Sequence, residues 1–202
     1  MNKKEIISKA EEFVKEKMKN YDPGHDWSHV ERVRNLAGII NSDLRADPFI
    51  LDLAAILHDS ADSKFPGGTR YDEIVNFLES SGQSAITARL INVIRNISFS
   101  NKNPEGDLND PVYLVLQDAD RLDAIGAIGV ARAFSYGSYR KNKLYEPGDE
   151  HGGKPGTTIH HFYDKLLKLT ELMNTEEGRR LAEERHRFLE KFLQQFYKEW
   201  NS

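Results

Sequence analysis

The feature that most limits the fold of this chain is the spacing of its apolar residues, which recur every three or four positions. Over the first twenty residues this spacing would give a helix one apolar face. That face is made of Ile6, Ile7, Ala10, Phe13, Val14 and Met18. No window alternates apolar and polar residues for long enough to predict a β-strand. We therefore expect an all-α fold.

Capping residues and turn residues divide the rest of the chain into further helices. Asp47-Pro48 and Asp110-Pro111 each look like an N-cap followed by proline in the first helical turn. The segment over 112–134 is apolar almost all round, which marks it as a central helix. The predicted helices span residues 27–42, 49–59, 71–80, 84–98, 112–134, 159–172 and 174–200, with Thr157 or Thr158 as the cap of the sixth.

Residues 136–157 contain five glycines and two prolines, which predicts a long loop. Such a loop is either a lid, whose lysines and tyrosines contact a phosphorylated ligand, or a surface connection without a catalytic part. We expect the whole chain, residues 1–202, to form one compact helical domain. Its main motifs lie in residues 21–135, and helices over 158–200 complete the bundle.

Composition excludes several classes of site. The chain has no cysteine, so a disulfide framework, a thiolate metal site and a cysteine nucleophile are all excluded. The net charge of −4 gives no reason to expect a nucleic acid or a membrane surface as the main partner. The first twenty residues lack the apolar stretch of a signal peptide or anchor, so we expect a cytoplasmic protein.

Three short motifs place polar residues on the apolar faces of separate helices. His29, His58 and Asp120 each lie at helical spacing from apolar residues of their own helix, so each should point inward. For a histidine alone, a hydrogen-bonded core role is the ordinary explanation. For an aspartate alone, the ordinary explanation is a helix cap or a pair with an arginine, here Arg121. Because burying a carboxylate is costly, inward imidazoles and carboxylates neutralise one another best around a divalent cation. The motifs are HDWSH (25–29), HDSAD (58–62) and QDADRLD (117–123).

The order H…HD…D, from His29 to Asp120, resembles the HD superfamily of metal-dependent phosphohydrolases. Within it, HDWSHVERV, LHDSADSKF and LQDADRLDAIGAIGVARAF look like the small bacterial hydrolases that act on nucleoside triphosphates and similar compounds. The resemblance extends through HHFYDKLLKL and TEEGRRLAEERHRFLEKF. It implies hydrolysis of a (d)NTP to the (d)NMP and pyrophosphate. A phosphodiesterase, a 5′-monophosphatase and a non-catalytic metal or nucleotide sensor are the alternatives.

The resemblance also implies four metal ligands: His29, His58, Asp59 and Asp120. Asp120 follows from the family pattern A-D-x-L at residues 119–122, with Asp118 and Asp123 as alternatives. Two nitrogens and two carboxylates suit Mn²⁺, Fe²⁺, Co²⁺, Ni²⁺ or Zn²⁺ better than Ca²⁺. Availability favours Mn²⁺, with Mg²⁺ as a weaker activator.

In related hydrolases an acidic residue three positions after the HD pair handles a proton, and here that residue is Asp62. We expect Asp62 to orient the attacking water or to protonate the leaving group; an exposed helix C-cap is the alternative. Substrate phosphates need cationic or hydrogen-bonding groups, although a surface salt bridge is the ordinary role of each. The candidates are His25, Lys64, Arg121, His161 and Lys165.

The last helix contains the run EERH at residues 183–186, which we interpret as a solvated face with local ion pairs. An exposed apolar stripe on the first or the last helix could serve a homodimer, although the core could also cover both.

Overall fold

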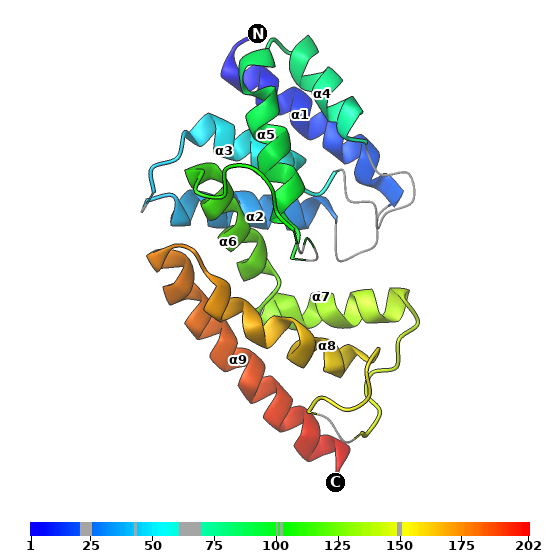
Figure 1. Cartoon of the computed structure of the whole chain (residues 1–202). Coiled ribbons are helices and arrows are strands. Elements are labelled where there is room, and N and C mark those ends of the chain that lie inside the picture. Colours follow the sequence, from blue (N-terminus) through cyan, green and yellow to red (C-terminus); the bar gives the residue numbers. More distant parts are fainter. Residues whose placement is uncertain (21–25, 43, 61–69, 100, 102, 149–150) are drawn as a thin grey trace. The chain divides into compact units, whose positions relative to one another are not determined.

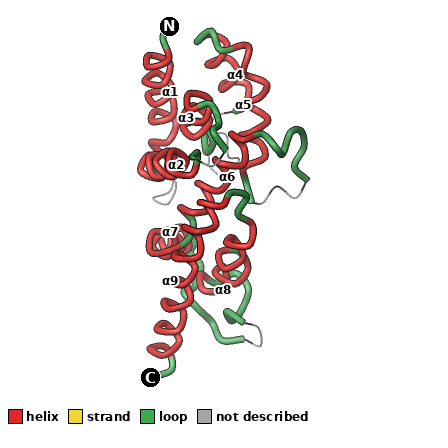
Figure 2. The backbone as a smooth tube through the Cα atoms, turned by 90° about the vertical axis from the view of Figure 1, so that its left-hand side faces the viewer, coloured by secondary structure: helices red, strands yellow, loops and turns green. Residues whose placement is uncertain are grey.

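The computed structural model of the chain describes residues 1–20, 26–42, 44–60, 70–99, 101, 103–148 and 151–202. Within these residues every regular element is a helix, which confirms the all-α prediction (Figures 1 and 2). In chain order the elements are α1 (Lys3–Lys17), η1 (Met18–Asn20), α2 (Trp27–Ile40), α3 (Pro48–Leu57), α4 (Tyr71–Ser80), α5 (Ser84–Ile97), α6 (Pro111–Asp123), α7 (Gly126–Tyr139), α8 (Thr158–Asp164), η2 (Leu166–Leu172) and α9 (Glu176–Trp200). The elements η1 and η2 are 3₁₀ helices.

The described residues fall into two compact units, of which the first extends to Asp120 and the second begins at Arg121. In the first unit α3 is central, since it packs against α1, α2 and α5, while α4 pairs with α5. All residues from Leu53 to Leu57 are fully buried, as expected for a helix that is apolar on every side. One domain over residues 1–202 stays a prediction.

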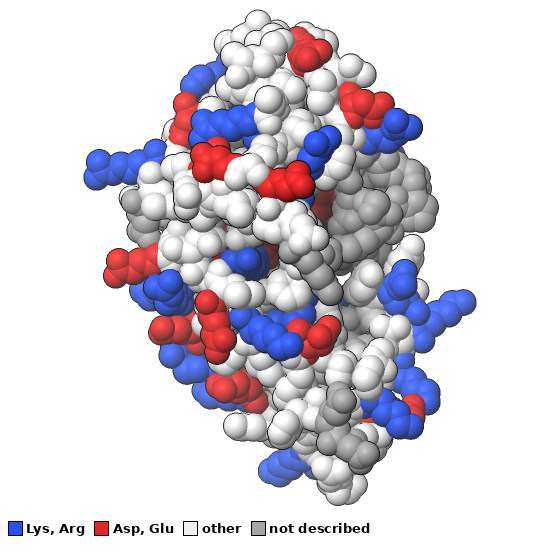
Figure 3. All heavy atoms as spheres, in the orientation of Figure 1, with Lys and Arg blue, Asp and Glu red and all other residues white. Residues whose placement is uncertain are grey.

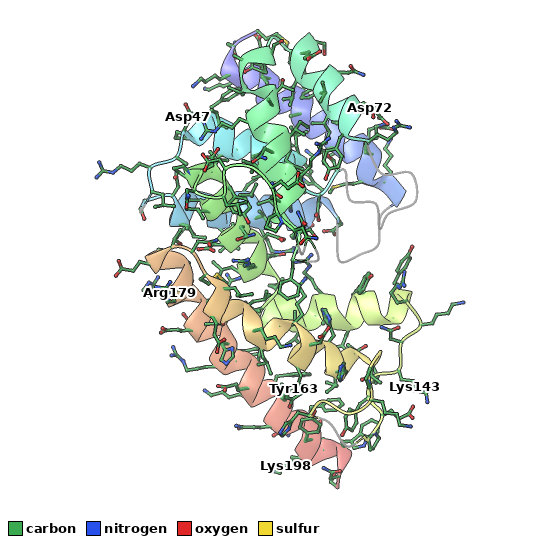
Figure 4. All side chains as sticks on the ribbon, viewed as in Figure 1. Asp47, Asp72, Lys143, Tyr163, Arg179 and Lys198 are labelled. Carbon is green, nitrogen blue, oxygen red and sulfur yellow. The ribbon has the colours of Figure 1, made fainter. Side chains whose placement is uncertain are left out.

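Both Asp-Pro helix starts are confirmed. The Asp47 carboxylate accepts the backbone N–H groups of Phe49 and Ile50 at 2.8 and 3.2 Å, at the start of α3 (Figure 4). The Asp110 carboxylate accepts the N–H of Val112 at 2.9 Å and two hydrogen bonds from the Arg89 guanidinium at 2.6 and 2.7 Å. These bonds satisfy N–H groups that the first turn of a helix leaves without partners.

The single central helix predicted over 112–134 is wrong, because the chain breaks between α6 and α7. The break occurs at Gly126, whose φ of 74° lies in the left-handed region that glycine tolerates best. The last turn of α6 tightens, with the Ile125 N–H bonded to the Leu122 carbonyl at 3.2 Å. The same carbonyl accepts a hydrogen bond from the Arg185 guanidinium at 2.6 Å.

The contact of Arg185 also corrects the interpretation of residues 183–186 as a solvated face. Arg185 is half-buried, and burial lowers the pKa of its guanidinium below the ordinary value. Glu183 and Glu184 are exposed as expected, and His186 lies 3.6 Å from the Glu190 carboxylate. The face is therefore solvated in part, and Arg185 belongs to the packing around the end of α6.

The second unit is built by α7, α8, η2 and α9, which share a core of aromatic rings. Phe162 is fully buried and packs against Phe134 and Phe192, with ring centroids 6.1 and 5.6 Å away. The single helix predicted over 159–172 is instead α8 followed by the 3₁₀ helix η2. Thr157 caps α8 by accepting the His160 N–H at 3.2 Å, and Thr175, rather than Asn174, caps α9.

The loop between α7 and α8 begins at residue 140, because α7 continues to Tyr139 beyond the predicted boundary. Lys143 and Lys154 both pair with Glu146 (Figure 4 labels Lys143). The ring of Tyr145 packs edge-on against the aromatic side chains at the end of α9, namely Phe196, Tyr197 and Trp200. These contacts hold the loop to its own unit, and a role as a lid stays a prediction.

Acidic and basic side chains are intermixed over the visible surface, in agreement with the small net charge (Figure 3). Among the described helices, none combines the length and the apolar character that crossing a membrane requires.

Candidate metal centre

The predicted ligands lie at the start of α2, at the end of α3 and in the last turn of α6. All four belong to the first unit. His29 lies in the first turn of α2, where the Asp26 carboxylate caps the helix by accepting the His29 N–H at 3.1 Å. His58 is the C-cap of α3, and Asp59 follows it. Asp120 lies in the last turn of α6. Each of the four residues therefore sits at or near a helix terminus.

The donor atoms of the two aspartates lie close to the Nε2 atoms of the two histidines. The Nε2 atoms of His29 and His58 are 3.3 Å apart, and their rings meet edge to face. The His29 Nε2 atom lies 3.2 Å from Asp59 Oδ2 and 3.6 Å from Asp120 Oδ1. The His58 Nε2 atom lies 3.7 Å from Asp59 Oδ1 and 3.9 Å from Asp120 Oδ1.

These separations fit a set of ligands around one ion. Donor atoms held about 2.1 Å from a transition-metal ion lie about 3.0 Å apart at right angles and about 4.2 Å apart on opposite sides. All five distances, from 3.2 to 3.9 Å, fall between these limits. One donor atom each from His29, His58 and Asp120 lies within 4.8 Å of the others, so these three residues could hold one metal ion. Two imidazoles with carboxylates are also the donor types that such ions prefer.

The tautomer of His58 follows from its second ring nitrogen. The Nδ1 atom lies 2.8 Å from the carbonyl oxygen of Ala55, one turn back on α3. Since a carbonyl can only accept, Nδ1 carries the proton, and the lone pair of Nε2 faces the other three side chains. This backbone contact is the type of support that orients histidine ligands in metal sites.

Burial differs between the histidines and the carboxylates. The side chains of His29 and His58 are each 1% exposed, whereas those of Asp59 and Asp120 are 16% and 29% exposed. Asp120 is thus less deeply placed than the apolar pattern of its helix predicts. The histidines therefore form the buried part of the cluster, and the two carboxylates form its more exposed part.

The two alternatives to Asp120 behave differently. Asp123 is buried and forms an ion pair with Arg132 of α7 at 2.8 Å, within the second unit. Asp118 is fully buried, whereas Asp120 is partly exposed and its Oδ1 atom lies within 4 Å of both histidine Nε2 atoms. The geometry therefore favours Asp120 over both.

The remaining predicted residues divide into two groups. His25, Asp62 and Lys64 lie outside the described residues. Arg121, His161 and Lys165 belong to the second unit. Arg121 donates a hydrogen bond to the Leu172 carbonyl. His161 is partly buried, and burial together with the nearby Lys165 charge lowers the pKa of its imidazole to about 4. His161 is therefore neutral near pH 7, and the substrate-binding roles of these residues stay predictions.

Ser60 lies in the motif HDSAD, directly after the HD pair, but nothing in the sequence indicated a role for it. Ser60 is fully buried, and both its N–H and its hydroxyl donate to the Leu57 carbonyl, at 3.1 and 2.7 Å. A serine after two ligand candidates carries no pattern of its own. The only available signal was its position at the predicted end of the helix.

Comparison with known proteins places this geometry in a family. The model of the HD domain family matches residues 26–125. The chain is 40% identical over 185 residues to the protein YpgQ of Bacillus subtilis (strain 168), covering 87% of this chain and 84% of YpgQ. A crystal structure of YpgQ in complex with ADP has a TM-score of 0.79 at 36% identity, over 96% of this chain and 97% of that one.

Two further crystal structures are similar over almost the whole chain. A protein from Lactobacillus plantarum has a TM-score of 0.84 at 32% identity, covering 98% of this chain and 97% of that one. An HD-superfamily hydrolase from Bacillus thuringiensis has a TM-score of 0.77 at 36% identity, covering both chains fully. The converging histidines and aspartates and these similarities lead to one conclusion: the chain belongs to the HD-domain superfamily and is a metal-dependent phosphohydrolase.

Proposed function

We propose that this protein hydrolyses nucleoside triphosphates to the monophosphate and pyrophosphate, with a divalent cation, preferentially Mn²⁺, held by His29, His58, Asp59 and Asp120. The observation that carries the proposal is that two partly exposed carboxylates lie within 4 Å of the Nε2 atoms of two buried imidazoles. A bound cation lowers the pKa of a coordinated water and polarises a phosphoryl oxygen.

The chain's own groups supply the rest of the reaction. The buried histidines provide neutral nitrogen ligands, and the Ala55 carbonyl keeps the His58 proton on Nδ1, away from the site. Water attacks the α-phosphorus, the bond from that phosphorus to the bridging oxygen breaks, and pyrophosphate leaves. Asp62 is the group proposed to orient the attacking water or to protonate the leaving oxygen.

The nucleotide part of the proposal is supported by a relative. YpgQ of Bacillus subtilis has been crystallised in complex with ADP, and it shares its fold with nearly the whole of this chain. ADP contains the adenosine and the α–β phosphoanhydride that ATP also contains. We extend this ligand class from YpgQ to this chain.

The choice of cation follows from the donor set. Imidazole nitrogen suits first-row transition ions, and carboxylate oxygen suits Mn²⁺ and Mg²⁺. A mixed set of two nitrogens and two carboxylates favours Mn²⁺ over Mg²⁺, which prefers oxygen ligands and keeps several waters. Fe²⁺, Co²⁺, Ni²⁺ and Zn²⁺ also fit this donor set, so the order of activation by these ions is part of the test.

The test is the metal-dependent release of pyrophosphate or phosphate from a panel of nucleoside triphosphates, monophosphates and cyclic nucleotides. Asp59→Ala removes a proposed ligand. Asp72→Ala is the matched control, since Asp72 is an exposed carboxylate in the first turn of α4 that forms an ion pair with Arg70 at 3.1 Å.

Pyrophosphate released from triphosphates with Mn²⁺ by the wild type and by Asp72→Ala, but not by Asp59→Ala, supports the proposal. Turnover of monophosphates or cyclic nucleotides alone would replace it with a 5′-monophosphatase or a phosphodiesterase. Metal binding without turnover of any of these compounds would indicate a sensor.

A further inference from the structure

The end of α3 is closed by a short hydrogen-bonded turn that contains both residues of the HD pair. The Leu57 carbonyl accepts the Ser60 N–H at 3.1 Å and the Ser60 hydroxyl at 2.7 Å. In an α-helix a carbonyl accepts the N–H four residues later in the chain, whereas here it accepts the N–H three residues later. The ring closed by these two bonds spans only His58 and Asp59.

This turn addresses a geometric difficulty of adjacent ligands. Neighbouring residues of an α-helix point about 100° apart, so two of them do not reach one ion from within a helix. His58 keeps helical dihedral angles, with φ −58° and ψ −41°, and its ring bonds back to Ala55. Asp59 follows outside α3, and its two carboxylate oxygens lie 3.2 Å from His29 Nε2 and 3.7 Å from His58 Nε2.

The hydroxyl of Ser60 is well placed to hold this arrangement. Ser60 is fully buried, as is Leu57, so water does not compete for the bond between them. The hydroxyl bond to the Leu57 carbonyl is shorter than the backbone bond of the same turn. Since a hydroxyl that bonds across the turn restricts its backbone, the side chain of Ser60 limits the dihedral angles of His58 and Asp59.

We propose that Ser60 is a positioning residue of the metal centre: its buried hydroxyl fixes the turn that directs the side chains of His58 and Asp59 to one ion. The inference rests on the proposed metal site. It concerns how that site is organised, since Ser60 itself is not among the proposed ligands. Loss of supporting bonds around metal ligands typically weakens metal binding by about tenfold to a hundredfold. We expect a loss of this size when the hydroxyl is removed.

The test is titration of the apo protein with Co²⁺, because the visible absorption of this ion reports both occupancy and coordination geometry. Ser60→Ala and Ser60→Gly remove the hydroxyl, and Ser60→Thr keeps it. The control is Ser80→Ala, since the Ser80 hydroxyl makes the same type of bond, to the carbonyl three residues before it (Phe77) at 3.0 Å, in the last turn of α4. Far-UV circular dichroism establishes that each variant is folded.

We expect Ser60→Ala and Ser60→Gly to bind Co²⁺ at least tenfold more weakly, with a changed visible spectrum. Ser60→Thr should recover affinity and spectrum, and Ser80→Ala should match the wild type. Wild-type affinity and spectrum in Ser60→Ala would overturn the inference, as would an equal loss in Ser80→Ala. A wild-type protein that does not bind Co²⁺ would instead overturn the proposed metal site.

Discussion

The Nε2 atoms of His29 and His58 lie 3.3 Å apart, although the residues are 29 positions apart in the chain. With the His58 proton on Nδ1, the lone pair of its Nε2 atom points toward His29 and toward the carboxylates of Asp59 and Asp120. Electron-rich groups this close destabilise one another unless a proton or a cation lies between them. The arrangement therefore predicts that the folded protein gains stability when it binds a divalent ion.

Adding Mn²⁺ should raise the melting temperature, because an ion that binds only the folded state stabilises it. The gain is about 2.7 kcal/mol when the free ion exceeds its dissociation constant about a hundredfold. Thermal unfolding with Mn²⁺, and again after EDTA removes the ion, measures the effect. The double variant His29→Ala/His58→Ala should show no Mn²⁺-dependent shift; a shift equal to that of the wild type would place the ion elsewhere.

Substitution of Asp120 should affect metal binding, whereas substitution of the nearby Asp123 should affect stability. Asp120→Asn should weaken Mn²⁺ affinity by at least about tenfold and leave the stability of the apo protein nearly unchanged, since Asp120 is partly exposed. Asp123→Asn should leave metal affinity nearly unchanged. It should destabilise the fold by about 3 kcal/mol, because the largely buried charge of Arg132 loses the carboxylate with which it forms an ion pair. Isothermal titration and urea unfolding of both variants provide the comparison. Reversed effects would show that Asp123 is the ligand.

Gly129, in the first turn of α7, should not tolerate a side chain. A Cβ atom at Gly129 would lie 2.2 Å from the carbonyl oxygen of Ala124, which is backbone and cannot move aside cheaply. We expect Gly129→Ala to cost about 2 kcal/mol or more in the free energy of unfolding. Gly38→Ala is the control, because nothing lies within 4 Å of its Cβ position on α2.

The control should stabilise the protein by about 0.5–1 kcal/mol, since alanine restricts the unfolded chain more than glycine does. Equal effects of Gly129→Ala and Gly38→Ala on urea unfolding would contradict the close approach at the junction of α6 and α7.

The burial of the His161 imidazole should make the protein less stable in mild acid. Burial, with the Lys165 charge, lowers the pKa of this imidazole in the folded state to about 4, from an ordinary value of 6.5. The unfolded chain therefore binds the additional proton first as the pH falls. The contribution of neutral His161 to the free energy of unfolding is therefore complete above about pH 6.5 and is lost as the pH falls toward about 4. After allowance for partial exposure, this contribution is on the order of 2 kcal/mol.

Urea unfolding at about pH 7 and about pH 4.5 tests this dependence. His161→Gln should flatten the change in the free energy of unfolding between the two conditions. His151→Gln should keep the wild-type dependence, because His151 is exposed. An unchanged slope in His161→Gln would show that its burial does not govern acid stability.

The parts of the fold that the sequence predicted correctly depend on local chemistry. The starts of α3 and α6 follow from Asp-Pro pairs whose carboxylates reach the N–H groups of the next residues. The break between α6 and α7 was missed because Gly126 alone marks it locally, and the bond from Arg185 to the Leu122 carbonyl joins residues far apart in the chain. The apolar pattern continues across the break, so periodicity alone predicts one helix.

The candidate site shows the same division. Periodicity predicts that His29 and His58 point inward, and both are buried. It cannot separate Asp120 from Asp118, since both have apolar neighbours at helical spacing. The ion pair of Asp123 is also hidden from the sequence, because Arg132 lies on a separate helix. The turn that Ser60 closes depends on where α3 ends, and helix ends are the least predictable feature of a sequence.

The most direct test of the account is anomalous diffraction at the manganese edge from a crystal grown with Mn²⁺. The account predicts one strong peak about 2.0–2.3 Å from His29 Nε2, His58 Nε2 and one oxygen each of Asp59 and Asp120. A peak coordinated by other residues, or no peak at these four side chains while Mn²⁺ is present in excess, would contradict it.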